Sequence, residues 1–221
     1  MKWHFRYANK SEDYPDIQLI LSSAVENPGA RETRAKFFNI SPDISGRLYK
    51  NTMYNESYYI IPVLLRPRSK GYIKLRSSNP HEHPIIVPNY FDDPHDLDVL
   101  ADGANFSHEM SKTPTMQRLK ARINPNKLAE CSSFPYPSTD YWRCFARYYT
   151  MTIYHPTGTC KMGPANDSMA VVDPRLRVYG VRRLRVVDAS IMPTIPSGNT
   201  NAPTIMVAEK AADLIKEDWA I

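Results

Sequence analysis

Apolar and polar residues alternate in several short stretches of the N-terminal part of the chain, and this period of two predicts β-strands. The predicted strands are Ile17–Leu21, at the start of the apolar stretch Ile17–Val25, and Tyr58–Leu65, Tyr72–Leu75 and Ile85–Val87. Between them, residues 26–57 are polar and contain Gly, Pro and Asn, so the pattern there predicts a long connection.

Two of the predicted strands are expected to form a hairpin. The segment between Tyr58–Leu65 and Tyr72–Leu75 is Arg66–Gly71, which contains Pro67 and ends in Gly71. Proline suits the interior of a turn, and glycine suits a position that needs positive φ. The sequence therefore predicts that these two strands pair with each other.

Helical spacing replaces the alternation after Asp93. Pro94 and nearby acidic residues mark the start of the predicted helix. The positions that recur on one face are Leu97, Leu100, Ala101, Ala104 and His108. A second helix is predicted over Ser138–Tyr149, with Ser138 or Thr139 as its cap.

The C-terminal part of the chain is predicted to contain two extended segments followed by one helix. Extended segments are predicted at Arg175–Val178 and at Leu184–Val187, on either side of a tight turn at Gly180. A final helix is expected from about Asn201 to Asp218, with Asn201 as its cap and a proline in its first turn. Its expected buried stripe is Ile205, Ala208, Ala211, Ala212 and Ile215.

The order of these elements indicates the fold class. Strands joined by hairpins come before the helices, which predicts an α+β fold with an antiparallel sheet and flanking helices. A boundary is expected near residue 150, so that 1–150 contains the sheet and the first helices. Residues 151–221 then contain a loop, a strand and the last helix.

Composition excludes two classes of protein. The 28 Lys and Arg residues exceed the 23 Asp and Glu residues by 5, but they are scattered, and only Arg182–Arg185 forms a cluster. A nucleic-acid-binding domain would concentrate them on one stripe, so no nucleic-acid partner is expected. Apolar runs all fall short of the ~18 residues of a membrane helix, so no membrane span is expected.

The cellular compartment stays open at this point. Met1–His4 lacks the apolar core of a secretory signal, so no signal peptide is predicted. Cys131, Cys144 and Cys160 show no metal-binding spacing. One disulfide with one free thiol, or three thiols, are equally allowed.

The strongest chemical candidate is His155. It precedes Pro156, which restricts the histidine backbone to extended conformations. Histidine exchanges a proton near neutral pH, so it suits a general base. An ordinary loop histidine that binds a carbonyl group would look the same locally, and Asn199 in Gly198-Asn199 would by itself be an ordinary turn residue.

Three other histidines are closely spaced. His81 and His83 flank an acidic residue, and His95 follows in the sequence. A polar loop of this kind is more often a solvent-facing turn than a metal site, and no helical ligand motif supports a metal here. We therefore predict no metal site.

Four segments in a fixed order resemble the C-terminal end of the glucose–methanol–choline (GMC) oxidoreductases. They are His155 with Gly158-Thr159-Cys160, then Asp188-Ala189-Ser190, then Pro196–Pro203 with Asn199, and finally Ala208–Asp213. The resemblance is strong over about the last 70 residues and extends more loosely to the turn Arg66–Gly71. Within the family, the segment around Asn199 is most similar to the insect glucose dehydrogenase-like branch.

The resemblance implies a mechanism. His155 and Asn199 would be the catalytic pair at the N5 edge of FAD. His155 would take the hydroxyl proton of an alcohol while hydride leaves the adjacent carbon for the flavin. Asn199 would orient the same oxygen, and because an amide cannot accept the proton, the base would be His155 alone.

The resemblance also implies cofactor contacts. Thr200, Asn201 and Thr204 at the start of the last helix would stabilise the negative charge of the reduced flavin, because a helix N-terminus offers free N–H groups. Asp188 and Ala189 would contact the ribityl and pyrophosphate part. For Asp188, a turn or capping role is the alternative.

The family's nucleotide-binding start is missing. The chain has 8 glycines, and no two are separated by a single residue, so GxGxxG is absent. We therefore expect a C-terminal part of a longer FAD enzyme, inactive alone, in which 1–150 is the substrate-binding region and 151–221 completes the FAD-binding domain.

The whole enzyme's partners follow from the resemblance. The substrate would be a small alcohol or sugar, and the electron acceptor would be oxygen or a quinone. Secretion would be plausible for an insect-type member. The alternative is a non-catalytic binding or interaction protein derived from the same fold.

Overall fold

The structure, a computed structural model of the 221-residue chain, describes residues 6–7, 11, 14–25 and 27–220. Met1–His4, on which the signal-peptide prediction depends, lie outside the described residues. The chain forms two compact units, one within Met1–Leu64 and Asp93–Ile153 and the other within Leu65–Asp92 and Tyr154–Ile221. The functional division near residue 150 stays a prediction.

The first unit contains a two-stranded antiparallel sheet. Strand β1 (Ile17–Val25) pairs with β2 (Glu56–Leu64), so that Ile17 lies opposite Leu64. Both strands occur where the alternation predicts them, but the predicted pairing of Tyr58–Leu65 with Tyr72–Leu75 is wrong. Alternation identifies a strand because side chains point to opposite faces, and it does not identify the partner.

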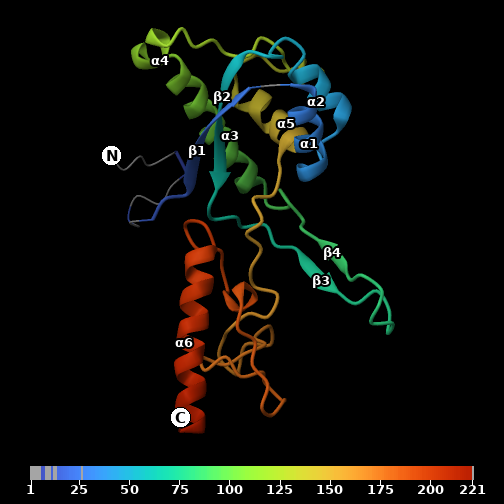
Figure 1. Cartoon of the computed structure of the whole chain (residues 1–221), viewed down its shortest axis with the longest axis vertical. Helices are drawn as coiled ribbons and strands as arrows, with labels where there is room; N and C mark the ends of the chain where they lie inside the picture. The colour runs from blue at the N-terminus through green and yellow to red at the C-terminus, as the bar shows by residue number, and fades with distance from the viewer. Residues whose placement is uncertain (1–5, 8–10, 12–13, 26, 221) are drawn as a thin grey trace. The chain divides into compact units, whose positions relative to one another are not determined.

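Helix α3 (Pro94–Ser111) packs against this sheet (Figure 1). Asp93 caps it by accepting a hydrogen bond from the His95 N–H at 2.9 Å, and Pro94 stands at its start, as the sequence indicates. At Gly103 an added Cβ would lie 2.8 Å from Ile17 Cδ1, so the glycine permits close contact with β1. The predicted helix is confirmed.

Two helices replace the predicted long connection of residues 26–57. Helix α1 (Pro28–Phe38) begins after Asn27, whose side chain accepts a hydrogen bond from the Ala30 N–H at 2.9 Å. Helix α2 (Pro42–Leu48) also begins with a proline. The Asn27-Pro28 pair was a start signal, but both helices are too polar for a clear apolar stripe.

Helix α5 (Thr139–Tyr149) is confirmed, with Ser138 as its cap. Its buried side packs on the short 3₁₀ helix η1 (Ala129–Cys131), and the remaining helix of this unit is α4 (Pro114–Arg118). Cys131 and Cys144 form a disulfide, while Cys160 is a free, half-buried thiol. Of the two cysteine arrangements left open by the sequence, the structure has the one with a single disulfide.

The second unit begins with a small hairpin. Strand β3 (Tyr72–Lys74) pairs antiparallel with β4 (Ile85–Val87). Gly71 is not a positive-φ glycine, which corrects the prediction. An added Cβ would lie 2.0 Å from the Val87 carbonyl oxygen, so the position needs glycine for close backbone approach.

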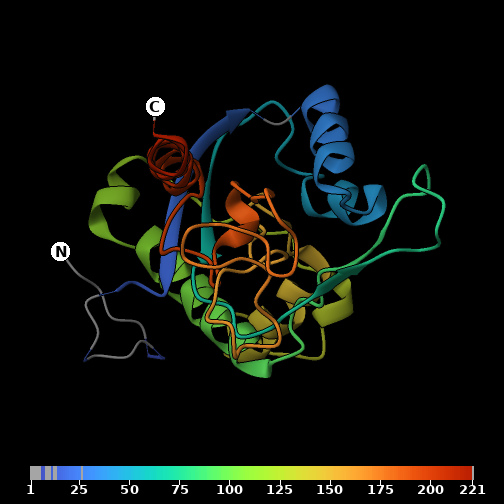
Figure 2. The same cartoon turned by 90° about the horizontal axis from the view of Figure 1, so that it is seen from below.

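The rest of this unit is mostly loop, which lies beside one helix, α6 (Asn201–Trp219), and contains the 3₁₀ helix η2 (Ala189–Ile191) (Figure 2). Val207 and Ala211 of α6 pack against the core around η2. The buried core residues are Val172, Leu176, Ile191, Met192, Val207 and Ala211. The small sheets and flanking helices of the two units confirm the α+β class.

The predicted strand Leu184–Val187 is not part of a sheet in the structure. It joins the segment before Gly180 through one antiparallel bridge, Arg177 to Arg185. Val186 N–H donates to the Leu176 carbonyl at 3.2 Å. Gly180 has φ +74°, which confirms the predicted turn.

One edge of the segment Leu184–Val187 makes no backbone hydrogen bonds among the described residues. In an extended chain successive residues direct their N–H and C=O groups to opposite edges, so Val186 faces the bridge and its two neighbours face away. Among the described residues, the backbone groups of Arg185 and Val187 have no hydrogen-bond partner. The segment is therefore a strand edge without its neighbour, which explains why the predicted strand is not complete.

The predicted buried stripe of α6 is largely wrong. The buried residues are Val207, Ala211 and Leu214, and Ala211 alone belongs to the predicted set. Residues of the predicted stripe that are exposed instead are Ile205, Ala208, Ala212 and Ile215, and Trp219 continues them at helical spacing. The helix thus has two adjacent apolar faces, and the described chain covers one of them.

Candidate functional site

The predicted catalytic loop lies beside the segment that follows Leu184–Val187. The Cys160 N–H donates to the Ser190 carbonyl at 3.0 Å, and the Met162 N–H donates to the Ile191 carbonyl at 2.8 Å. Gly158 has φ +86°, a conformation that favours glycine. Two of the four motifs are therefore joined through their backbones.

His155 is half-buried in this loop. The residue before it, Tyr154, has φ +64°, a rare conformation for an aromatic residue. Together with Pro156 on the other side, this bend fixes the course of the chain on both sides of the imidazole. Such backbone strain occurs preferentially at functional sites.

Thr200 connects the histidine to the last helix. Its Oγ1 lies 2.9 Å from Nδ1 of His155, and Thr200 is buried. The prediction that Thr200 holds the flavin did not include this contact. A hydroxyl-bearing residue directly after Asn199 was the signal that could have suggested it.

Asn199 immediately precedes Thr200, so the structure brings the two predicted catalytic residues into one region through this contact. The Asn199 side chain is exposed, and within the described chain its amide has no hydrogen-bond partner. The loop before it is held by Arg66, whose Nε donates to Ser197 Oγ at 3.2 Å. The amide is thus available to a ligand.

The first turn of α6 fits an electron-rich group. Thr200 occupies the cap position without a side-chain capping bond, which corrects the prediction of Asn201 as the cap. Among described residues, the N–H groups of Asn201 and Ala202 have no partner. Free N–H groups and the positive end of a 19-residue helix attract negative charge.

The other predicted cofactor residues have local roles in this structure. Thr204 Oγ1 donates to the Thr200 carbonyl at 2.6 Å. Asp188 caps η2 by accepting a bond from the Ser190 N–H at 2.7 Å, and its side chain is exposed. Ala189 is half-buried in the same turn. Their contacts with FAD stay predictions.

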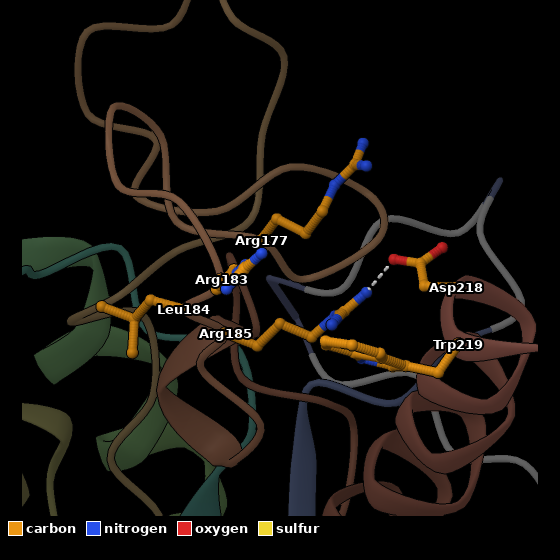
Figure 3. Close-up of a pocket in the computed structure, with 6 residues that line it drawn as sticks. All are labelled: Arg177, Arg183, Leu184, Arg185, Asp218 and Trp219. Atoms are coloured by element: carbon orange, nitrogen blue, oxygen red, sulfur yellow. Dashed lines mark hydrogen bonds and ion pairs between the residues drawn. The ribbon is translucent and has the colours of Figure 1, made fainter.

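A hollow of about 210 Å³ in this unit contains none of the predicted site residues (Figure 3). It is lined by Arg177, Arg183, Leu184, Arg185, Asp218 and Trp219. Arg185 forms an ion pair with Asp218, and Arg177 forms one with Asp173. A hydrogen bond from Arg175 is the main cause that lowers the pKa of Asp218, so this carboxylate stays charged and offsets the arginines.

Of the closely spaced histidines, His81 and His83 belong to the second unit and His95 to the first. His81 and His83 lie in an exposed turn, which agrees with the solvent-facing interpretation. In the part of the chain that the structure describes, no group of three or more His, Cys, Asp or Glu residues could hold a metal ion. The helices described there are also too short or too polar to cross a membrane.

A family model and individual known proteins both match this chain, and their names all describe oxidoreductases or dehydrogenases. A family model described as GMC oxidoreductase matches residues 67–208. Glucose dehydrogenase [FAD, quinone] of Drosophila melanogaster is 40% identical over 214 residues, which are 97% of this chain and 32% of that protein. Mitochondrial choline dehydrogenase of Mus musculus is 41% identical over 205 residues, 92% of this chain and 30% of that protein.

Solved structures show the same relationship. A fungal aryl-alcohol oxidase aligns with a TM-score of 0.64 and 26% identity over 87% of this chain and 35% of that one. Pyridoxine 4-oxidase from Mesorbium loti aligns with a TM-score of 0.62 and 27% identity over 73% of this chain and 30% of that one. The chain spans about a third of the length of the curated relatives it matches.

Proposed function

Because this chain belongs to the GMC oxidoreductase family, we propose that it is the base-containing C-terminal part of an FAD-dependent enzyme. That enzyme oxidises the CH–OH group of a small alcohol or sugar. The observation that supports the proposal most directly is the convergence of the His155 loop with Asn199 and the start of α6 through the Thr200 contact.

The residues have separate roles in the proposed reaction. FAD, when bound, supplies the acceptor for the hydride that leaves the alcohol carbon. Nε2 of His155 removes the hydroxyl proton, and such general-base assistance is typically worth ~10²–10⁴ in rate. The Asn199 amide donates a hydrogen bond to the same oxygen and orients it.

The first turn of α6 would hold the cofactor. The free N–H groups of Asn201 and Ala202 can donate to an anionic edge of the flavin, with Thr200 and Thr204 beside them. Asp188 and Ala189 would lie along the rest of FAD. The incomplete strand edge and the exposed stripe of α6 support a second half of the FAD-binding domain, supplied by sequence outside this chain.

The electron acceptor and the substrate are proposed as classes. The insect relative is named for quinone, and solved relatives are named as oxidases, so the acceptor is a quinone or oxygen. Relatives named for glucose, choline and aryl alcohols support an alcohol or sugar substrate.

Reconstitution tests the proposal. The chain is joined to an FAD-binding half, such as that of the fruit-fly glucose dehydrogenase, and FAD absorbance and alcohol-dependent bleaching are measured. We expect a yellow complex that alcohol reduces. His155→Ala should lower turnover by roughly 10²-fold or more with FAD still bound, because the base is lost.

His81→Ala is the matched control, since this histidine lies in an exposed turn. It should retain normal turnover. A joined protein that takes up no flavin would contradict the proposal and favour the non-catalytic alternative. Near-normal turnover of His155→Ala would remove this residue from the mechanism.

We also propose that the chain matures in an oxidising compartment, which includes the secretory route. The disulfide between Cys131 and Cys144 supports this, because such bonds are rare in reducing compartments. In protein from its native source, with free thiols blocked and the chain then cut after Arg143 without reduction, mass spectrometry should find Cys131 and Cys144 in linked peptides and Cys160 carrying the blocking group. Blocking groups on both Cys131 and Cys144 would contradict the proposal.

A further inference from the structure

The contact between Thr200 and His155 involves one ring nitrogen of the histidine and leaves the other open. The imidazole uses Nδ1 for the hydroxyl of Thr200, at 2.9 Å. The other ring nitrogen, Nε2, has no hydrogen-bond partner among the described residues. The two nitrogens of the ring are therefore in different environments.

Thr200 is held firmly enough to impose this arrangement. It is 9% exposed, and its carbonyl accepts the Thr204 N–H at 3.0 Å and the Thr204 hydroxyl. The helix that follows is anchored by Val207 and Ala211 in the core of the unit. Because its side chain makes no capping bond, the Thr200 hydroxyl remains available for the imidazole.

We propose that Thr200 is a positioning residue that keeps His155 in the tautomer with the proton on Nδ1. In this tautomer Nδ1–H donates to Oγ1 of Thr200 and Nε2 has a free lone pair. A base needs that lone pair. The inference rests on the proposed function, in which His155 is the base.

The same hydrogen bond persists when the base is used. Once Nε2 has taken the alcohol proton, both ring nitrogens carry hydrogen, and Nδ1–H still donates to the hydroxyl oxygen. The opposite tautomer would place hydrogen on Nε2, so it could not accept the proton. A hydroxyl at position 200 therefore supports both states of the reaction without a change of side-chain position.

Kinetics on the joined holoenzyme test this role. Thr200→Val removes the acceptor and keeps the shape, so kcat should fall by about tenfold or more, while KM changes by less than about threefold and FAD remains bound. Thr200→Ser restores the hydroxyl and should recover most of the rate. Thr194→Val, at an exposed loop position of the same unit, is the control and should match the wild type.

Tautomer measurement gives a second readout that needs no turnover. Two-bond ¹H–¹⁵N NMR correlations of histidine-labelled protein, assigned with His155→Ala, report which nitrogen is protonated. We expect Nδ1–H in the wild type and in Thr200→Ser, and a shift toward Nε2–H in Thr200→Val.

Several outcomes would overturn the inference. A wild-type imidazole protonated mainly on Nε2 contradicts it without any variant, so a misfolded Thr200→Val does not protect it. An unchanged kcat in Thr200→Val also contradicts the inference, provided that His155→Ala has lost its activity. If the joined protein binds no flavin, the proposed function fails, and the tautomer of His155 in the 221-residue chain still decides the role of Thr200.

Discussion

At the scale of single residues, the chemistry depends on what surrounds each titratable group. His155 could be selected from the sequence, because its neighbours and its place among four ordered motifs were visible there. Its partner Thr200 could not, since 45 residues separate them along the chain and only the fold brings them together. Spacing in a sequence does not state which hydroxyl meets which ring nitrogen.

His108 gives a prediction about pH. It is 8% exposed in the first unit and lies edge-on to the ring of Tyr136. Burial is the main cause that lowers the pKa of His108, and the charge of Lys112 adds to it. On acidification the unfolded chain therefore binds a proton before the folded one does.

Neutral, buried His108 therefore stabilises the fold in a way that depends on pH. The stabilisation is complete above the ordinary pKa of histidine, about 6.5, and decreases as the pH falls below it toward the lowered value of the folded state. Urea unfolding at pH 7.5, 6.5 and 5.5 should give a falling free energy of unfolding. His108→Leu should flatten this part of the dependence, and an equally steep fall in that variant would assign the effect elsewhere.

At the scale of elements, the sequence predicts where helices start more reliably than it predicts which strands pair. Pro94 and the predicted cap Ser138 mark the starts of α3 and α5 correctly, because such start signals act between near neighbours in the sequence. The sequence predicts the wrong partner for β2. Its true partner, β1, is distant along the chain, and the alternation of apolar and polar residues does not indicate which strands pair. Helices α1 and α2 were missed because their faces are mainly polar.

Helix α6 is the clearest case in which the sequence predicts an apolar stripe but not what covers it. The stripe expected to be buried is apolar, and in the described chain it is exposed, while Val207, Ala211 and Leu214 face the core. Ile215→Glu should change the stability of the chain alone by less than about 0.5 kcal/mol, because the position is on the surface. In the joined protein it should strongly reduce flavin incorporation, because an unpaired charge would be buried.

The matched control is Met206→Glu. Met206 is also exposed, but it lies on the polar side of α6, outside the stripe. It should leave flavin incorporation unchanged, measured as the ratio of flavin to protein absorbance after purification. Equal incorporation in the two variants would show that the stripe is not covered by the other half.

At the scale of the whole molecule, the chain spans about a third of the length of its relatives. The missing glycine motif could be recognised from the sequence alone, because it is a local pattern. The surfaces that another segment would cover could not be recognised in this way. Apolar residues of α6 look the same in the sequence whether this chain or another segment buries them. In the described chain one apolar face of α6 is exposed, and the backbone groups of Arg185 and Val187 have no hydrogen-bond partner.

The open edge at Arg185 and Val187 has a consequence for the chain on its own. A bare strand edge invites pairing with a second copy, and from there aggregation. Here the turn that leads into the edge contains Arg182 and Arg183, both exposed and without an ion pair among the described residues. Two copies aligned in parallel along this edge would bring these guanidinium groups together, and their mutual repulsion disfavours that arrangement.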